Sequence, residues 1–372
     1  MLEKVNWKLF IDDIENCEYI ICIGAGKGLR RMEEIFGETS LVKKIKYVAD
    51  NDHNKQGTEI VLNKTNIVIQ SVPSLLPVVT QNVVIVITSF YCLDILAQLE
   101  SYDEFSQVKK YYYTHIYGAY LDDIAMKKQI PDNIRLSEQI LIPKVIHYCW
   151  FGRTPIPEKY KVWMRSWKKY CPDYEIIEWN EDNYDITKNQ YMLQAYENKK
   201  WGFVSDYARL DIIYNFGGIY LDTDVELIKN IDDLLYQRGY VGFECDEYVN
   251  TGLGFGAVAG NMMIKGMRDS YDEYSFVDAE GNINLTPCPI IQTEYLLTQG
   301  LQQNGEYQIL RDELTIYPEK MLSGKGGNSR QITLMPYTCS IHHFAASWMD
   351  EKDRKNRELV ASQLDRINRI MM

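Results

Sequence analysis

The stretch from residue 201 to residue 226, WGFVSDYARLDIIYNFGGIYLDTDVE, constrains the fold of this chain more than any other. Ser205 is of a residue type that accepts hydrogen bonds from the free amide groups at a helix start, and Gly217-Gly218 is typical of a helix end. The short apolar run 219–221 is of the kind that is buried in a parallel sheet. The stretch therefore predicts a helix, a tight turn and a strand, as in an α/β fold.

Two aspartates, Asp222 and Asp224, stand where this predicted strand leaves the core. If the backbone turns there, the two carboxylates lie ~5–6 Å apart in a partly dry place, and a cation is needed to offset their repulsion. A divalent metal that carries phosphates is the natural partner. An Asp-x-Asp at a strand end is also common as a solvated turn, so the pair alone does not decide between the two interpretations.

Asp206 and Arg209 precede this pair on the predicted helix and, three residues apart, share one of its faces. An Arg held in this way offers a planar fork to a phosphate or to sugar hydroxyls. Together, Ser-Asp-x-x-Arg followed by Gly-Gly-x-Tyr-x-Asp-x-Asp resembles the DXD glycosyltransferases. These include bacterial capsular-polysaccharide sugar transferases, fungal initiating mannosyltransferases and, more distantly, the glucosylating clostridial toxins.

The resemblance extends upstream, where the family begins its catalytic domain with Ile-Pro-Lys-x-Ile-His and Trp-x-Gly. Here the pattern occupies residues 142–147 and Trp150 to Gly152, with a strand predicted over 145–149. Trp150 at a strand end offers a flat face for a nucleobase or is a core aromatic, and the resemblance favours the nucleobase. His147, inside the strand, is more typical of a core residue than of a catalytic base.

The resemblance covers roughly residues 141–350 and implies a GT-A type nucleotide-diphospho-sugar transferase domain. It implies transfer of a hexose from a UDP- or GDP-sugar to a hydroxyl of a capsular, lipopolysaccharide or related glycan, with a lipid-linked acceptor among the alternatives. Mn²⁺ or Mg²⁺ would neutralise the departing diphosphate. The family retains the anomeric configuration, and no residue of this chain stands out as a nucleophile, which favours a front-face mechanism.

The same resemblance assigns roles to individual residues. Asp224 is the first choice for direct metal ligation, and Asp222 would touch the ribose or the metal through water. Asp206 and Arg209 would act in catalysis by holding sugar hydroxyls and phosphate. The remaining donor-binding candidates are Trp150, Ser205, Tyr220, Asn250, Ser347 and Trp348.

A further metal ligand is expected from the C-terminal pair His342-His343, because related GT-A enzymes recruit a ligand from this position. Neighbouring side chains of an extended segment point to opposite sides, so only one histidine should face the metal. We favour His343 slightly, with Ser347 and Trp348 reaching the diphosphate from the same loop. The alternative is that both histidines are structural.

The first 135 residues predict a Rossmann-like α/β domain. A strand over 19–23 leads into Gly24-Ala25-Gly26-Lys27-Gly28, and a second strand over 45–49 ends at Asp50, where a ribose hydroxyl lies in a dinucleotide fold. The third glycine of the G-x-G-x-x-G pattern is out of register, because Gly28 comes one residue early. One alternative function is therefore a dinucleotide-dependent oxidoreductase acting through Gly24 to Gly28, and another is a non-catalytic glycan-binding scaffold.

The expected layout is thus a Rossmann-like domain over 1–135, a catalytic domain over 140–350 and a C-terminal helix over 351–372. A net charge of −12 argues against nucleic acid as a partner, because such a surface needs clustered excess Lys and Arg. The start lacks the pattern of a signal peptide, and the most apolar stretch, 67–90, is too interrupted to span a membrane. The eight cysteines form no Cys-x-x-Cys pair, which fits a reducing cytoplasm. We expect a cytoplasmic protein that can make peripheral contact with the inner face of the cell membrane.

Overall fold

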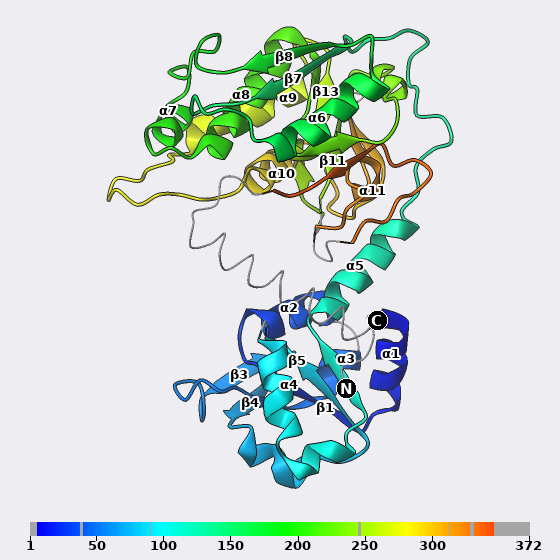
Figure 1. Cartoon of the computed structure of the whole chain (residues 1–372), viewed down its shortest axis with the longest axis vertical. Helices are drawn as coiled ribbons and strands as arrows, with labels where there is room; N and C mark the ends of the chain where they lie inside the picture. Colours follow the sequence, from blue (N-terminus) through cyan, green and yellow to red (C-terminus); the bar gives the residue numbers. More distant parts are fainter. Residues whose placement is uncertain are drawn as a thin grey trace. The chain divides into compact units, whose positions relative to one another are not determined.

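The computed structural model describes residues 6–345 except 38, 39, 90, 245, 246, 312 and 328–330. It divides the chain into two compact units, with the division between Asp122 and Asp123 (Figure 1). This division falls inside helix α5 (His115–Lys127). The predicted helix over 351–372 and the donor-binding candidates Ser347 and Trp348 lie outside the described residues.

The first unit is built on a six-stranded sheet of order β3-β4-β2-β1-β5-β6, in which only the β3–β4 pair is antiparallel. Successive residues of β1 alternate between two hydrophobic clusters, so the sheet is buried on both faces, as its apolar runs predict. The strands are β1 (Tyr19–Ile23), β2 (Ile45–Ala49), β3 (Glu59–Leu62), β4 (Thr65–Gln70), β5 (Val83–Ile87) and β6 (Lys110–Tyr113). The helices before α5 are α1 (Trp7–Asn16), α2 (Lys27–Phe36), α3 (Ser40–Lys43) and α4 (Cys92–Glu100), with 3-10 turns η1 (Pro73–Val78) and η2 (Asp103–Gln107).

The glycine-rich turn after β1 shows why Gly28 comes early in its motif. A Cβ at Gly28 would lie 2.4 Å from the carbonyl oxygen of Thr88, so the missing side chain lets α2 pack closely against the end of β5. That is the packing role of the third glycine in a dinucleotide-binding turn. Asp50 turns toward the same loop, where its carboxylate accepts hydrogen bonds from the Ala25 amide at 2.7 Å and from Lys55 Nζ at 2.9 Å. Nucleotide binding by this unit stays a prediction.

The second unit contains a mixed eight-stranded sheet of order β14-β15-β11-β13-β9-β7-β8, with β12 paired to β11. The β7–β8, β7–β9 and β11–β15 pairs are parallel, whereas β13 runs antiparallel to both of its neighbours. A separate ribbon pairs β10 with β16. The strands are β7 (Val145–Cys149), β8 (Glu175–Trp179), β9 (Gly218–Tyr220), β10 (Val225–Leu227), β11 (Gly239–Phe243), β12 (Val249–Asn250), β13 (Phe255–Ala257), β14 (Gln308–Leu310), β15 (Leu314–Tyr317) and β16 (Ser340–His342).

Helix α8 (Trp201–Phe216) is the central helix of this unit, and ten of its residues are buried. It ends as predicted, because Gly217 and Gly218 adopt φ values of 65° and 102° and turn the chain directly into β9. The other helices are α6 (Glu158–Tyr170), α7 (Gln190–Glu197), α9 (Met262–Asp269), α10 (Cys288–Thr298) and α11 (Glu319–Leu322), with 3-10 turns η3 (Asp232–Leu235), η5 (Thr251–Leu253) and η6 (Ser270–Glu273).

The predicted start of this helix at Ser205 is wrong, because α8 begins four residues earlier at Trp201. Phe203 and Val204 are buried in the core, and their packing extends the helix past the residue that could have capped it. The Ser205 hydroxyl instead donates to the carbonyl of Trp201 at 3.2 Å, as serine does inside a helix. The predicted α/β class itself is confirmed by both sheets. Within the part of the chain that the structure describes, no helix combines the length and apolarity that crossing a membrane requires.

Candidate active site

The Asp-x-Asp segment lies in a turn between two strands of different sheets. Leu221 follows β9, the amide of Val225 donates to the carbonyl of Asp222 at 3.0 Å, and β10 begins at Val225. The β10–β16 ribbon places His342 directly opposite Val225, although 117 positions separate them in the sequence. The pairing register thus brings the C-terminal histidine pair beside the two aspartates.

Asp222, Asp224 and His342 form a cluster whose ligand atoms all lie within 4.8 Å of one another. Asp224 Oδ1 is 3.2 Å from His342 Nε2, and its Oδ2 accepts a hydrogen bond from the amide of Ala345 at 2.7 Å. The two carboxylates suit both Mn²⁺ and Mg²⁺, whereas the imidazole suits Mn²⁺ better than Mg²⁺. The buried Nδ1 of His342 has no hydrogen-bond partner among the described residues, which also fits a site that a ligand completes. The donor set therefore fits a divalent metal.

Electrostatics makes the two aspartates unequal. Burial alone would raise the pKa of Asp224, but the adjacent His342 and the Ala345 amide outweigh it and hold this pKa at about 2. The pKa of Asp222 is raised, because burial and the charge of Asp224 prevail over the attraction of Arg209. Asp224 is therefore firmly anionic, whereas Asp222 lies where a further positive charge would be stabilising.

Arg209 lies behind the cluster and is buried, with 3% of its surface exposed. Its Nη2 is 2.9 Å from Asp206 Oδ1 and 3.4 Å from Asp222 Oδ1, and the Tyr220 hydroxyl donates to the same Asp222 oxygen at 3.0 Å. The predicted pairing of Asp206 with Arg209 is confirmed. Burial raises the pKa of Asp206 to about 6, against the opposing effect of Arg209. Contact of Asp206 and Arg209 with the donor stays a prediction.

Two residues next to this network were not singled out by the sequence. Cys288 Sγ lies 3.9 Å from Arg209 Nη1 and 3.8 Å from Asn250 Oδ1, which places the first residue of α10 against the site. A Cβ at Gly252 would lie 2.8 Å from Asp222 Oδ2, so only glycine leaves room there. Asn250, two residues before this glycine, was among the predicted donor-binding residues, and the glycine was the signal that could have indicated a close approach. No local sequence pattern around Cys288 indicated that it lies beside Arg209 and Asn250.

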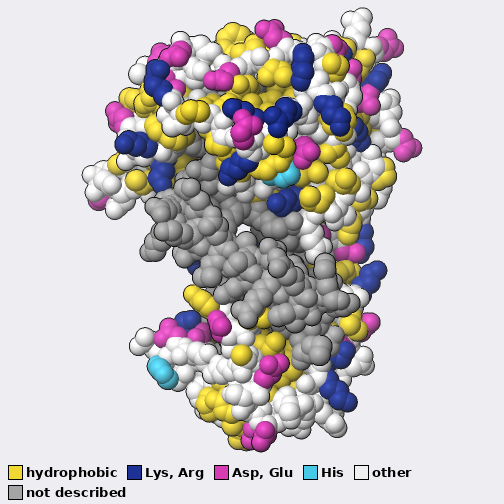
Figure 2. All heavy atoms as spheres, in the orientation of Figure 1, with side chains coloured by type: hydrophobic (Ala, Val, Ile, Leu, Met, Phe, Trp, Pro, Cys, Tyr) yellow, Lys and Arg dark blue, Asp and Glu magenta, His cyan; other side chains and the backbone are white. Residues whose placement is uncertain are grey.

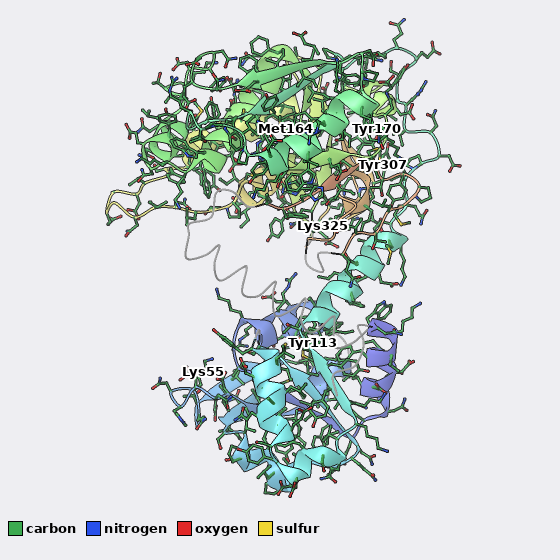
Figure 3. All side chains as sticks on the ribbon, in the orientation of Figure 1. Lys55, Tyr113, Met164, Tyr170, Tyr307 and Lys325 are labelled. Atoms are coloured by element: carbon green, nitrogen blue, oxygen red, sulfur yellow. The ribbon has the colours of Figure 1, made fainter. Side chains whose placement is uncertain are left out.

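The structure separates the two C-terminal histidines, as alternation in an extended segment requires. The favoured choice, His343, is not the one beside the aspartates: its Nε2 lies 2.9 Å from Glu226 Oε2, and its ring stacks on Trp163 at 4.2 Å. Lys325, labelled in Figure 3, donates to the carbonyl of His343 at 3.3 Å. His342 takes the position by the cluster because it lies opposite Val225 in the ribbon.

Trp150 directly follows β7, and His147 lies in the middle of this strand. Trp150 is partly exposed, and its indole N–H donates to the carbonyl of Thr154 at 2.6 Å, which fixes the ring at the strand end. Stacking on a base stays a prediction. His147 is a core residue, as expected: its Nε2 is 3.0 Å from the Gly217 carbonyl and its Nδ1 is 3.0 Å from Trp179 Nε1. Burial lowers its pKa to about 4.

Comparison with known proteins decides the family to which this site is similar. Residues 157–240, which contain the Asp-x-Asp segment, match the family described as "Glycosyltransferase sugar-binding region containing DXD motif". The predicted family resemblance is confirmed. The matched family is one of glycosyltransferases.

The similar curated proteins come from fungi and from a giant virus. Inositol phosphoceramide mannosyltransferase 3 of Schizosaccharomyces pombe is 32% identical over 109 residues, which cover 28% of this chain and 30% of that protein. Mannosyl phosphorylinositol ceramide synthase SUR1 of Saccharomyces cerevisiae is 33% identical over 99 residues, 26% of each chain. An uncharacterized glycosyltransferase, L373, of Acanthamoeba polyphaga mimivirus is 31% identical over 101 residues, 26% of this chain and 40% of that protein. The chain therefore spans well under half the length of these relatives.

Among solved structures, a chain named PaToxG Glycosyltransferase is similar, with a TM-score of 0.36 and 19% sequence identity. The superposition covers 48% of this chain and 74% of that chain.

Proposed function

We propose that this chain is a metal-dependent glycosyltransferase whose second unit is a GT-A type domain. It moves a hexose from a nucleoside diphosphate sugar to a hydroxyl of a glycan acceptor. The observation that carries the proposal is the cluster of Asp222, Asp224 and His342 at the end of β9, within the segment that matches the DXD family. A mixed α/β sheet with an acidic pair beyond a strand end supports the GT-A assignment.

The donor and acceptor are proposed from the relatives. The fungal relatives are named as mannosyltransferases or a mannosyl synthase, so mannose is the first donor sugar to test. Their names also contain inositol phosphoceramide or phosphorylinositol ceramide, which favours a lipid-linked acceptor here. A capsular or lipopolysaccharide precursor carried on a lipid meets that description.

The residues of the site divide the work as follows. A bound Mn²⁺ or Mg²⁺ would supply positive charge to the departing diphosphate. Asp224 and His342 would hold the ion, with Asp222 beside them. Arg209 and Tyr220 fix the Asp222 carboxylate through contacts of 3.4 Å and 3.0 Å, so that the charge of the site is arranged before the donor binds.

The proposal also covers proton transfer and stereochemistry. Asp206 is tied to Arg209 at 2.9 Å, which suits it to orienting the donor better than to attacking the anomeric carbon. We therefore keep a retaining, front-face route in which the leaving phosphate accepts the proton of the acceptor hydroxyl. Trp150 is proposed to stack on the base of the nucleotide.

A cytoplasmic location is proposed from the thiols. The seven cysteines that the structure describes are all free, which suits a reducing compartment. Contact with the inner face of the cell membrane would bring the site to a lipid-linked acceptor.

The proposal is tested by ligand-dependent thermal stability followed by donor hydrolysis. The full chain is heated with GDP-mannose, UDP-glucose or NADH, each with and without Mn²⁺. Stabilisation and hydrolysis of a sugar nucleotide only with Mn²⁺ support the transferase, and loss of both in Asp224→Asn ties them to the cluster. Stabilisation by NADH alone would instead favour the oxidoreductase. Response to free oligosaccharide alone would indicate a glycan-binding scaffold.

A further inference from the structure

Helix α6 has two faces of different character. Its inner stripe, Tyr160, Trp163, Met164 and Trp167, recurs at helical spacing and is buried or half-buried. Trp167 Nε1 donates to the carbonyl of Val225 at 2.8 Å, so this stripe holds the strand that follows the Asp-x-Asp segment. Met164 and Tyr170, labelled in Figure 3, lie on this helix. The inner face thus has a structural task.

The outer face is exposed and strongly basic. We call it the α6 basic face, and its members are Lys159, Lys161, Val162, Arg165, Lys168 and Lys169. The only carboxylate of the helix is Glu158 at its start, so basic side chains outnumber acidic ones by five to one in a chain whose net charge is −12. Figure 2 shows Lys and Arg side chains gathered over this part of the second unit.

Local partners leave most of this charge uncompensated. Glu158 lies 3.1 Å from Lys161 and 3.9 Å from Arg165, and both contacts are well exposed, so they screen the two cations only weakly. Lys168 and Lys169 bond instead to neutral oxygens, the carbonyl of Tyr174 at 3.3 Å and the hydroxyl of Tyr170 at 3.1 Å. In the described ranges, no recorded ion pair includes Lys159, Lys168 or Lys169.

We propose that the α6 basic face binds a membrane surface rich in anionic lipids. Several long cationic side chains on the outside of one helix match a plane of mobile headgroups, where each Lys or Arg contributes ~1 kcal/mol of attraction, about fivefold in affinity. Val162, 54% exposed in the middle of the face, adds an apolar contact. A soluble acidic glycan is the less favoured partner, because the outer side of a helix offers no groove to enclose a chain.

The position of the face would link membrane binding to the site. Trp163, in the inner stripe of the same helix, stacks on His343, the residue next to His342 of the Asp222–Asp224–His342 cluster. A membrane bound along the outer face of α6 would therefore lie about one helix diameter, ~10 Å, from this side of the cluster, where a lipid-linked acceptor could present its hydroxyl. This last step rests on the proposed function, whereas binding to the lipid surface does not.

The test is co-sedimentation of the full chain with phosphatidylcholine vesicles, with and without phosphatidylserine, at low and high salt. We expect binding only to vesicles that contain phosphatidylserine, and its loss at high salt. Replacing Lys161, Arg165 and Lys168 by Gln should weaken binding by about 100-fold, given a roughly fivefold contribution of each charge. Glu158→Gln should strengthen it by a few-fold.

A matched control removes the same charge elsewhere: Lys43→Gln, Lys46→Gln and Lys109→Gln change three exposed lysines of the first unit. This control should keep wild-type binding. Equal loss in the control, or no preference of the wild type for phosphatidylserine, would overturn the proposal. Tighter binding to a soluble acidic polysaccharide than to the vesicles would overturn it in favour of a glycan partner.

Donor hydrolysis in solution separates this inference from the proposed function. The α6 triple variant should hydrolyse the sugar nucleotide at the wild-type rate. If no variant, nor the wild type, hydrolyses a donor while vesicle binding follows the charges of α6, the transferase proposal fails and the membrane face stands.

Discussion

Each of the two units has an acidic residue just after a buried strand, yet the two acidic residues differ in how their charge is balanced. In the first unit Asp50 follows β2, and burial, which would raise its pKa, is outweighed by hydrogen bonds from Asp52, Lys55 and Ala25, so the pKa is lowered. In the second unit Asp222 follows β9, and burial together with the charge of Asp224 raises its pKa despite Arg209. The partners of Asp50 thus outweigh its burial, whereas those of Asp222 do not.

This difference between the pKa values of Asp50 and Asp222 indicates which of the two strand ends should bind a cation. An aspartate at a strand end whose pKa is lowered by its partners has a structural role and needs no added cation. Three carboxylates, of which Asp206 and Asp224 are buried and Asp222 is half-buried, share one arginine and one histidine and so leave a place for added positive charge. The following predictions are designed to test that contrast.

The largest effect is expected from removing the charges of the second unit. Asp224→Asn and Asp222→Asn should each lower sugar transfer by about 1,000-fold or more, because the metal would supply several kcal/mol of charge stabilisation. Circular dichroism should show an intact fold. Asp50→Asn is the matched change in the first unit and should leave transfer unchanged. Near wild-type transfer in Asp224→Asn would remove the metal assignment.

Metal dependence should distinguish the two histidines next. His342→Ala should raise the Mn²⁺ concentration needed for half-maximal donor hydrolysis by about 10- to 100-fold, because a ligand to the metal is lost. His343→Ala keeps the cluster and should change this concentration by less than about threefold. A larger effect in His343→Ala than in His342→Ala would reverse the assignment made from the ribbon register.

A pair of glycines offers a smaller and more local comparison. Gly252→Ala places a methyl group 2.8 Å from Asp222 Oδ2, and Gly28→Ala places one 2.4 Å from the carbonyl of Thr88. The first should lower transfer by about tenfold with a modest loss of stability, and the second should destabilise the first unit by ~1–3 kcal/mol while sparing transfer. Thermal unfolding and steady-state kinetics of both variants check this. Equal loss of transfer in the two would show that the units are not separable in this way.

Features of the fold and site could be predicted from the sequence where the contacts that determine them are local. The turn at Gly217-Gly218, the buried strand after it and the Asp206–Arg209 pair follow from spacings of a few residues, and all three are as predicted. The start of α8 was missed because core packing of Phe203 and Val204 outweighed a capping preference worth ~1 kcal/mol.

Contacts between segments far apart in the sequence could not be predicted from local patterns. Alternation correctly allowed one histidine of the pair to face the aspartates, but the choice depends on the β10–β16 register, which no local pattern encodes. Cys288 reaches Arg209 only because α10 packs beside β12, and the charge balance of Asp50 depends on where Lys55 folds back. The basic outer stripe of α6, by contrast, can be read directly from the sequence once the helix is placed.

Trp150→Ala should weaken nucleotide binding by ~1–3 kcal/mol if the ring stacks on the base. The exposed part of the ring makes this possible without loss of the fold, since its backbone remains paired to Trp179 through an N–H to O contact of 2.9 Å. Isothermal titration with the nucleoside diphosphate, with circular dichroism as the control for folding, checks it. A variant that fails to fold, with no separate binding defect, would return Trp150 to the core.

The smallest expected effect is on stability as a function of pH, and it bears directly on the two kinds of acidic end. In metal-free protein, Asp224 raises the pKa of His342 above its ordinary value of 6.5, although burial acts in the opposite direction. Stability from this histidine is therefore present below pH 6.5 and lost as the pH rises through the folded pKa. The pKa of Asp224 is lowered from its ordinary value of 3.8 to about 2. Asp224 therefore stabilises the fold at pH values above 3.8, and this contribution is lost as the pH falls toward 2.

The His342–Asp224 pair should thus stabilise the fold by about 2 kcal/mol between pH 3.8 and 6.5, and less on either side. Asp50, whose pKa is also lowered, contributes stability that is lost only on the acid side. Urea unfolding of wild type, His342→Gln and Asp50→Asn across this range checks both curves. The difference between wild type and His342→Gln should shrink above neutral pH, whereas the difference for Asp50→Asn should stay constant there. If both differences were flat up to alkaline pH, the histidine would not be charged beside Asp224. The difference in charge compensation between the two strand ends would then depend on Arg209 alone.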